Sequence, residues 1–374
     1  MKIGIDARKI RDFGIGIHLE NLIRYIPEHD AENEYIIFHY PGDETRIPQT
    51  GPNIRLVPDH SPKYSLQELV VLPVKMRRQR LDLFHAPHYT LPPFRPCKAV
   101  VTIHDAIHLR FPEYLPHPAA YYYAKWMMWA AAKSARKVIT VSECSKRDLI
   151  TYLHIPPTKI EVVYNGIEVC DQSLLHDSKP CQSVLDRFEI HCSYLLYFGN
   201  FMPHKNLETL IKAYGILKRR YQIPQCLVLA GKNDRLKETL HTLIQQEQVA
   251  QDVILTGVVE EAWKSSLYAC ADLFVYPSLY EGFGLQTLEA MAHQIPVVIT
   301  DIAALTEIVG EAAVRCDPRS AENMAEAIYA VLSNPTLKAS LIDKGNVRVQ
   351  AFSWRAMARK TVEIYHSVLQ EAQQ

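Results

Sequence analysis

Short, continuously apolar runs alternate with longer helix-forming segments along this chain, and the alternation starts again in the second half. Continuous apolar strands separated by helices indicate a parallel sheet that is covered by helices on both faces. The first series of expected strands covers residues 2–5, 35–39, 54–57, 83–85, 99–103 and 138–141. The second series covers residues 194–198, 226–230, 253–256, 273–276 and 296–299. The pattern therefore predicts an α/β fold of two doubly wound, Rossmann-like domains.

The length of 374 residues and a change of composition in mid-chain also suggest two domains. Residues 165–193 are less regular and richer in Asp, Ser, Gln and Cys, which indicates an interdomain linker. We expect an N-terminal domain over residues 1–170 and a C-terminal domain over residues 190–352. A last helix over residues 353–374 is long enough to pack across the junction. Ligands of open α/β sheets bind beyond the carboxyl ends of the strands, so the loops after the strands should line a cleft between the domains.

Charge and composition exclude several classes of protein. The 41 basic and 41 acidic residues cancel, which argues against nucleic acid as the partner. The N-terminus lacks the apolar core of a signal peptide, and no apolar run approaches the roughly 20 residues of a membrane-spanning helix. The eight cysteines form no C-x-x-C pair, which favours reduced, mostly buried thiols over a disulfide framework or a zinc site. These features predict a cytoplasmic globular protein.

The segment YEGFGLQTLEAMA carries two carboxylates, Glu281 and Glu289, on either side of a glycine-bearing turn that follows a strand. Free backbone N–H groups at the start of the following helix would bind phosphate. Carboxylates instead accept hydrogen bonds from sugar hydroxyl groups. The combination suits a nucleotide sugar. The alternative is a plain strand-to-helix turn with Glu289 as a solvated helix residue.

Two further side chains follow expected strands. Lys205 precedes a helix, where a cation does not favour the helix dipole, so we expect it to bind a diphosphate. The alternative is a solvated surface lysine. His104 ends the strand over residues 99–103, where it could donate a hydrogen bond to a sugar hydroxyl or a phosphate, or transfer a proton. The alternative is a structural histidine.

The glycines after the first strand form a poor dinucleotide fingerprint. Gly14 and Gly16 are followed by Leu19 at the third glycine position, and no acidic residue ends the second strand. Both features argue against an NAD-dependent oxidoreductase. We expect these glycines to lie in a loop that lets the backbone approach a ligand. The sequence also lacks a D-x-D motif, so we expect transfer without a metal ion or other cofactor.

A basic and aromatic segment lies in the N-terminal half. Residues 121–132 read YYYAKWMMWAAA and are flanked or interrupted by Lys125, Lys133, Arg136 and Lys137. Basic charge beside an aromatic helix is compatible with peripheral membrane contact or with sugar stacking. The alternative is an amphipathic core helix with a solvated face. A second basic cluster comprises Lys75, Arg77, Arg78 and Arg80.

Taken together, these segments resemble the family 4 retaining glycosyltransferases, which have the GT-B fold. The resemblance rests on the E-x7-E motif from Glu281 to Glu289, on GNFMPHKN, on Asn165-Gly166-Ile167, on VITVSECSKRDL and on TIHD. It covers nearly the whole chain. It implies that the C-terminal helix crosses back to the N-terminal domain.

The resemblance also implies roles for single positions. The donor-binding positions it implies are Gly16, Asn200, Lys205, Gly257, Val258, Glu281, Gly282, Phe283, Gly284, Leu285 and Glu289. The catalytic positions it implies are His104, Glu281 and Lys205. Glu281 would hold the donor sugar, Glu289 the ribose, and Gly257 with Val258 the base. Asn200 stands where many members have an arginine, and the Ile17-His18 pair stands where relatives often have Arg-Tyr, so acceptor identity cannot be carried over.

The activity implied by the resemblance is transfer of a hexose, most often glucose or mannose, with retention at the anomeric carbon. The donor would be a UDP-sugar, slightly favoured, or a GDP-sugar. The acceptor would be a hydroxyl group of a glycan or a lipid-linked acceptor in polysaccharide biosynthesis. The alternatives are a non-catalytic nucleotide-sugar-binding protein, an NAD-dependent oxidoreductase, and a sugar phosphorylase, for which no cofactor-binding lysine is evident.

Overall fold

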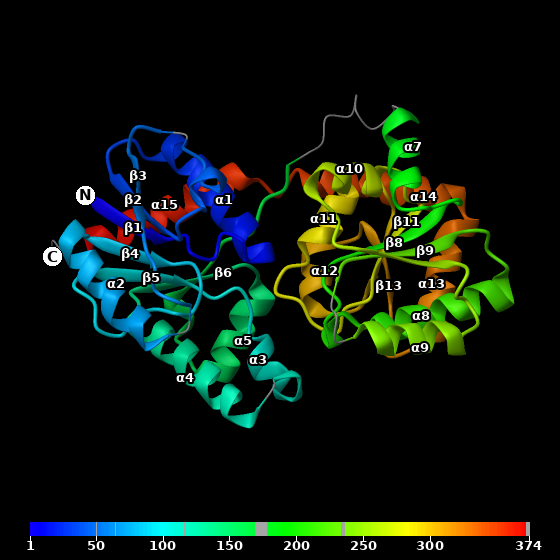
Figure 1. Cartoon of the computed structure of the whole chain (residues 1–374), viewed down its shortest axis with the longest axis horizontal. Coiled ribbons are helices and arrows are strands. Elements are labelled where there is room, and N and C mark those ends of the chain that lie inside the picture. The colour runs from blue at the N-terminus through cyan, green and yellow to red at the C-terminus, as the bar shows by residue number, and fades with distance from the viewer. Residues whose placement is uncertain (50, 64, 116, 169–177, 233–235, 372–374) are drawn as a thin grey trace. The chain divides into compact units, whose positions relative to one another are not determined.

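The computed structural model describes residues 1–374 except residues 50, 64, 116, 169–177, 233–235 and 372–374. The chain divides into two compact units (Figure 1). Unit 1 comprises Met1–Gly166 together with Ser353–Gln374, and unit 2 comprises Ile167–Phe352. Each unit is an α/β layer structure with its own sheet.

The sheet of unit 1 has seven parallel strands among the described residues, in the order β3-β2-β1-β4-β5-β6-β7. These strands are β1 (Lys2–Asp6), β2 (Glu34–His39), β3 (Ile54–Pro58), β4 (Leu83–Ala86), β5 (Lys98–Thr102), β6 (Lys137–Thr140) and β7 (Ile160–Val162). The register pairs Ile3 with Tyr35 on one side and with Leu83 on the other. All three side chains are fully buried. Burial on both faces explains why these strands are continuously apolar rather than alternating.

The helices of unit 1 cover this sheet. They are α1 (Phe13–His29), α2 (Leu66–Gln79), α3 (Ile107–Arg110), α4 (Pro118–Ser134), α5 (Glu143–Leu153) and α15 (Trp354–Gln370), with short 3-10 turns η1 (Glu44–Arg46), η2 (Pro112–Tyr114) and η3 (Pro157–Lys159). Serine side chains cap three of them: Ser65 at α2, Ser142 at α5 and Ser353 at α15. Each hydroxyl oxygen accepts a hydrogen bond from a backbone N–H group that would otherwise be unpaired in the first helical turn.

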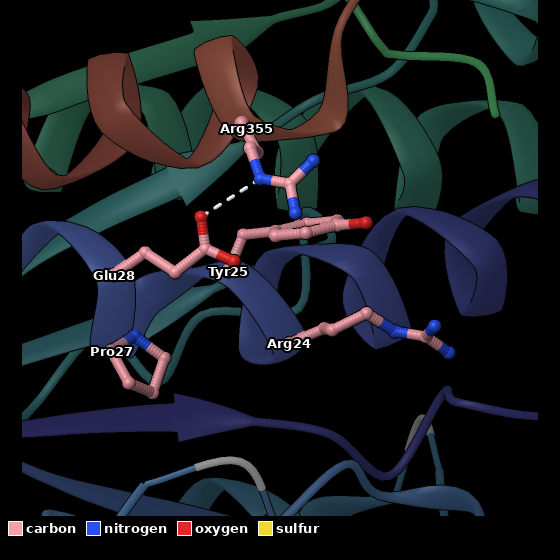
Figure 2. Close-up of a pocket in the computed structure, with 5 residues that line it drawn as sticks. All are labelled: Arg24, Tyr25, Pro27, Glu28 and Arg355. Atoms are coloured by element: carbon pink, nitrogen blue, oxygen red, sulfur yellow. Dashed lines mark hydrogen bonds and ion pairs between the residues drawn. The ribbon is translucent and has the colours of Figure 1, made fainter. Parts of the chain in front are cut away.

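The last helix, α15, packs on α1 within unit 1, as Figure 2 shows. Arg355 donates from Nε to Glu28 at 2.9 Å, and its guanidinium lies 4.8 Å from the ring centre of Tyr25. Deeper in the interface, the hydroxyl of Tyr365 is 2.6 Å from Nδ1 of His85 on β4. The C-terminal helix is therefore part of the N-terminal unit.

Asp30 links three elements of unit 1 beside α15. Its carboxylate accepts hydrogen bonds from Asn33, from the Tyr35 hydroxyl at 2.6 Å and from His366 at 3.1 Å. Burial alone would raise the pKa of Asp30, but these hydrogen bonds outweigh it and lower the pKa to about 2. The ionised carboxylate therefore stabilises the junction of α1, β2 and α15.

Unit 2 holds a second parallel sheet, six-stranded over the described residues, in the order β10-β9-β8-β11-β12-β13. Its strands are β8 (Tyr194–Phe198), β9 (Cys226–Ala230), β10 (Val253–Gly257), β11 (Leu273–Tyr276), β12 (Val297–Thr300) and β13 (Ala313–Cys316). Its helices are α7 (Ser178–Arg187), η4 (Pro203–Lys205), α8 (Leu207–Ile216) continued by η5 (Leu217–Tyr221), α9 (Lys237–Gln246), α10 (Glu261–Ala269), α11 (Leu285–Ala292), α12 (Ala303–Val309), α13 (Ala321–Ser333) and α14 (Pro335–Val349).

The strand order reverses beside the first strand of each sheet. In unit 1, β1 lies between β2 and β4, and in unit 2, β8 lies between β9 and β11. At such a switch point the loops leave their strands in opposite directions, and ligands of open α/β sheets bind beyond the carboxyl ends there. The segments after β8 and β11 are therefore where a ligand of unit 2 is expected.

Three expectations from the sequence were wrong, and they concern the glycine loop, the linker and the cysteines. Gly14 and Gly16 do not lie in a loop, because α1 begins at Phe13 and contains both. The predicted linker over residues 165–193 contains the helix α7, which packs on α10; residues 169–177 of that stretch lie outside the described residues. Its polar composition hides a helix in which Val184 is the one buried side chain among residues 182–187.

The expectation of reduced thiols was also wrong for Cys192, Cys226 and Cys270, which are disulfide-bonded. The structure joins Cys192 and Cys226 in a disulfide. The register explains the pairing, because Cys226 lies opposite Tyr194 and Cys192 comes just before that residue. Cys97, Cys144 and Cys316 are not disulfide-bonded.

Candidate active site

The turn before α8 is fixed to the end of β11 by Asn206. This residue has a left-handed backbone with φ of 58°, which asparagine tolerates better than most residues. Its amide nitrogen donates to the carbonyl groups of Pro277 at 3.0 Å and Pro318 at 2.8 Å. The adjoining η4 turn is thereby held against the strand end, and Lys205 is its last residue.

Lys205 and Glu281 form a buried ion pair at this switch point. The Lys205 ammonium lies 2.6 Å from Oε1 of Glu281, and the two side chains are only 11% and 10% exposed. Lys205 also donates to the Tyr276 hydroxyl at 3.0 Å, and Ser278 donates to the same Glu281 oxygen at 2.7 Å. The alternative of a solvated surface lysine is thus excluded.

The environment keeps Glu281 ionised. Burial alone would raise the pKa of Glu281, but the charge of Lys205 and the hydrogen bonds from Lys205 and Ser278 outweigh it and lower the pKa. A buried carboxylate that stays charged at neutral pH is a strong acceptor for hydroxyl groups.

The second carboxylate, Glu289, is also buried and paired. Its Oε1 lies 2.5 Å from the ammonium of Lys264 on α10, and its Oε2 accepts a hydrogen bond from the Tyr268 hydroxyl at 3.0 Å. The alternative of a solvated helix residue is excluded here too. No sequence pattern pointed to Lys264 or Tyr268, because both belong to a helix that precedes β11 and they meet Glu289 only through the packing of α10 on α11.

The glycine turn leads directly into α11. Gly284 has φ of 87°, and a Cβ atom there would lie 2.4 Å from Leu305, so a side chain would be both strained and crowded. The N-cap residue is Gly284 itself, which has no side chain to cap the first turn of α11. Phe283 is buried edge-to-face against Phe352. The helix N-terminus beside Glu281 can therefore present backbone N–H groups to an anion.

The remaining predicted donor positions of unit 2 lie at the carboxyl edge of the same sheet. Oδ1 of Asn200, just after β8, is buried and accepts no hydrogen bond from the described residues. Such an atom is uncommon, and a ligand hydroxyl or N–H group would satisfy it. Gly257 ends β10 with φ of 70°, and Val258 after it is exposed.

In unit 1, His104 follows β5 and is held by the end of β4. Its Nε2 lies 3.1 Å from the carbonyl oxygen of Pro87. Because a carbonyl can only accept, Nε2 carries the proton and Nδ1 is the acceptor nitrogen. Burial, with the nearby His18 ring, lowers the pKa of His104 to about 3. The ring is neutral at neutral pH, so it suits hydrogen bonding better than proton transfer.

Packing inside unit 1 leaves no room for a side chain at Gly16. A Cβ atom on Gly16 would lie 2.1 Å from the carbonyl oxygen of Ile10. The bare glycine lets the first turn of α1 fold against the loop that precedes it. Two residues further along α1, Nδ1 of His18 lies 2.8 Å from Oδ1 of Asn165. This hydrogen bond joins α1 to the segment that ends at Gly166, where the chain leaves unit 1.

Comparison with known proteins decides the family. Residues 14–169 match the family profile described as Glycosyltransferase Family 4, and residues 192–348 match the profile described as Glycosyl transferases group 1. An O-antigen chain mannosyltransferase B from Escherichia coli is 30% identical over 76% of this chain and 74% of its own length. The chain belongs to glycosyltransferase family 4.

Solved structures place this family 4 glycosyltransferase in the GT-B fold. Sucrose-phosphate synthase from Thermosynechococcus elongatus aligns with a TM-score of 0.79 and 20% identity over 99% of this chain and 100% of its own. Anabaena HepE in complex with UDP-glucose aligns with a TM-score of 0.76 and 19% identity over 98% of this chain and 100% of its own. The predicted fold of two Rossmann-like domains is thus confirmed.

Among the described residues, no group of three or more His, Cys, Asp or Glu side chains is arranged to hold a metal ion. None of the helices in the described part of the chain is both long and apolar enough to cross a membrane.

Proposed function

We propose that this family 4 glycosyltransferase moves a hexose, with mannose expected before glucose, from a nucleoside-diphosphate sugar to a hydroxyl group of a growing glycan or lipid-linked acceptor. The observation that carries the proposal is the buried Lys205–Glu281 pair at the switch point of unit 2, beside the uncapped start of α11. Mannose is supported by the name of the Escherichia coli relative. UDP-glucose is the second candidate donor, because Anabaena HepE, which has the same fold, was solved in complex with it.

The two charges of the pair suit two parts of one ligand. The Lys205 cation and the N–H groups of α11 would stabilise negative charge on the departing diphosphate. The ionised carboxylate of Glu281 would accept hydrogen bonds from hydroxyl groups of the transferred sugar. Glu289 would accept hydrogen bonds from the ribose hydroxyl groups, and these would replace part of its contact with Lys264.

We further propose that transfer retains the configuration at the anomeric carbon and needs no metal ion. Glu281 is bound to Lys205 and Ser278 through one oxygen, so it is a poor nucleophile. In the proposed step the bond from the anomeric carbon to the diphosphate breaks and the bond to the acceptor oxygen forms on the same face. The acceptor proton moves to the departing phosphate oxygen. We place the reaction in the cytoplasm.

A donor panel tests the proposal. The melting temperature of the protein should rise with GDP-mannose or UDP-glucose, because a ligand that binds the native state stabilises it. Transfer from the donor that binds should persist in EDTA, and NMR of the product should show the anomeric configuration of the donor. Glu281→Ala should abolish transfer. Donor hydrolysis without transfer to any offered glycan would contradict the function, and an inverted product would contradict the stereochemistry.

A further inference from the structure

His18, on α1, lies against the ring of His104. The two ring centres are 5.1 Å apart and the rings are perpendicular, which is the edge-to-face contact that aromatic rings favour. His18 is only 1% exposed, whereas His104 is partly buried just after β5. His18 is therefore an internal neighbour of a predicted catalytic position.

One hydrogen bond fixes the tautomer of each ring. Nδ1 of His18 lies 2.8 Å from Oδ1 of Asn165, and Nε2 of His104 lies 3.1 Å from the carbonyl oxygen of Pro87. Both oxygens can only accept, so the protons are on Nδ1 of His18 and on Nε2 of His104. The other nitrogen of each ring is then an acceptor, and it makes no hydrogen bond to any residue that the structure describes.

The amide group that holds His18 is itself held by packing of the main chain. Asn165 is 8% exposed, and Gly166 follows it. A Cβ atom on Gly166 would lie 2.0 Å from the backbone nitrogen of Trp354, the first residue of α15. The segment that carries Asn165 therefore packs backbone to backbone on α15. A continuous series of contacts leads from α15 through Asn165 and His18 to His104.

The surroundings keep both rings uncharged. Burial lowers the pKa of His18, and the hydrogen bond to Asn165 opposes this only in part. Burial, with the nearby His18, lowers the pKa of His104 to about 3. Burial also lowers the pKa of the neighbouring His85 and His88, and a charge on any of these rings would repel a charge on His104. Nδ1 of His104 can thus accept a hydrogen bond from a hydroxyl group, whereas an ionised phosphate has no proton to give it.

We propose that His18 is a positioning residue for His104, and that it holds the ring at the angle at which Nδ1 of His104 accepts a hydrogen bond from a hydroxyl group of a bound sugar. His18 itself does not touch the substrate. It acts through His104, and Asn165 acts through His18. The inference rests on the proposed transfer reaction and adds a supporting residue to it, because a reacting group needs neighbours that lock its orientation.

The alternative is a core histidine that only fills space beside α1. An apolar ring would fill that space without burying polar atoms, whose transfer from water costs free energy unless each one is paired. His18 and Asn165 are both buried, and they pair with each other directly behind His104. A polar pair at this place is explained by the orientation of His104 and not by packing.

Steady-state kinetics of the full chain, with GDP-mannose or UDP-glucose as donor, test the proposal. His18→Phe keeps a flat ring but loses the nitrogen that binds Asn165, so the ring is no longer held beside His104. The kcat should fall by about 10- to 100-fold, because a displacement of about 1 Å from the productive geometry can cost about 100-fold. The KM for the donor should stay within about twofold, because His18 makes no contact with the donor. Asn165→Leu releases the same ring and should have the same effect.

His39→Phe is the matched control. His39 ends β2, is 2% exposed and has Nδ1 2.9 Å from the carbonyl oxygen of Tyr40. This variant should leave kcat unchanged. Donor hydrolysis without an acceptor identifies the sugar: it should fall together with transfer in His18→Phe if the hydroxyl group belongs to the transferred hexose, and stay unchanged if it belongs to the acceptor.

Histidine NMR of the full chain gives a result that does not depend on transfer. Wild-type protein should show His104 as the Nε2–H tautomer alone. In His18→Ala, water can reach the ring and the neighbouring imidazole is gone, so the pKa of His104 should rise from about 3 towards its ordinary value of 6.5.

Three results would overturn the proposal. One is an unchanged kcat in folded His18→Phe and Asn165→Leu proteins, with folding checked by circular dichroism. Another is an equal fall of kcat in His39→Phe, which would indicate a general loss of stability. The third is a tautomer and pKa of His104 that do not change in His18→Ala. If neither donor is transferred while the NMR signals change as expected, the proposed reaction fails and the positioning of His104 by His18 stands.

Discussion

Breaking the Lys205–Glu281 pair from one side should destabilise unit 2 strongly. The ammonium and carboxylate are 2.6 Å apart and about nine-tenths buried, so Lys205→Met leaves a buried carboxylate without its cation. Removing one partner of a buried ion pair costs about 3–5 kcal/mol. Glu281→Gln should cost less, because the neutral amide can still accept a hydrogen bond from Ser278 or Lys205.

The double variant gives the sharper result. With Lys205→Met and Glu281→Gln together, no unpaired buried charge remains, so the loss should be smaller than the sum of the two single losses. We expect a coupling free energy of about 2–3 kcal/mol between the two positions, near the upper end for residues in contact.

Hydrogen exchange is the appropriate measurement. Unfolding of a chain with two units need not be two-state, whereas exchange of amides in β11 and α11 reports the opening of the site itself. A loss of about 3 kcal/mol corresponds to exchange that is about 100-fold faster. Arg219→Met, which breaks the more exposed pair with Glu247, is the control and should change exchange little. Additive single effects, with coupling below about 0.5 kcal/mol, would show that the two buried charges do not stabilise each other.

The stabilisation contributed by the Lys205–Glu281 pair should decrease in acid. Because the pKa of Glu281 is lower in the folded protein than in the unfolded chain, its stabilisation is fully present above the unfolded pKa of about 4.3 and is lost as pH falls through the folded value. The difference in exchange between wild type and Glu281→Gln should therefore shrink below about pH 4.

Three other predictions concern positions outside that pair. Lys264→Met should weaken donor binding and thermal stability together, because it leaves Glu289 buried without its cation; unchanged stability would show that the pair contributes nothing. Gly16→Ala should destabilise unit 1 by about 1–3 kcal/mol in urea unfolding, whereas Gly14→Ala, where a Cβ atom meets open space, should be neutral or stabilising. Asp30→Asn should cost about 2 kcal/mol at pH 7, and that difference should disappear as pH falls from about 4 towards the folded pKa of about 2; a difference that persists at pH 2 would contradict the assigned pKa.

The sheets of this protein could be predicted from the sequence, whereas some helices could not. Strands buried on both faces carry continuous apolar runs, and this signal located β8, β9 and β11 almost to the residue. By contrast, the sequence of α7 is polar, and Val184 is the one buried side chain among residues 182–187, so this segment reads as a linker. The face of α4 that packs on the core could not be predicted either, because large apolar residues such as Trp126 and Trp129 lie on its exposed side.

The candidate site shows a similar division. Glu281 and Lys205 could be picked out because each follows an expected strand, and strand order then brings them into contact. Their partners Tyr276 and Ser278 follow from the same strand end. Lys264 could not be predicted, because its contact with Glu289 depends on how two helices pack, which no local sequence pattern records. The roles of these residues in donor binding stay predictions.

The place of α15 in unit 1 has a consequence for biosynthesis. Unit 2 is one unbroken stretch, so it can fold as soon as Phe352 has left the ribosome. Unit 1 must wait until α15 has been made, because His85 and Lys98 bind groups on α15. Most of the N-terminal unit is thus made before unit 2 and completed after it, and the surface of α1 and β5 that α15 covers needs protection from aggregation during that interval.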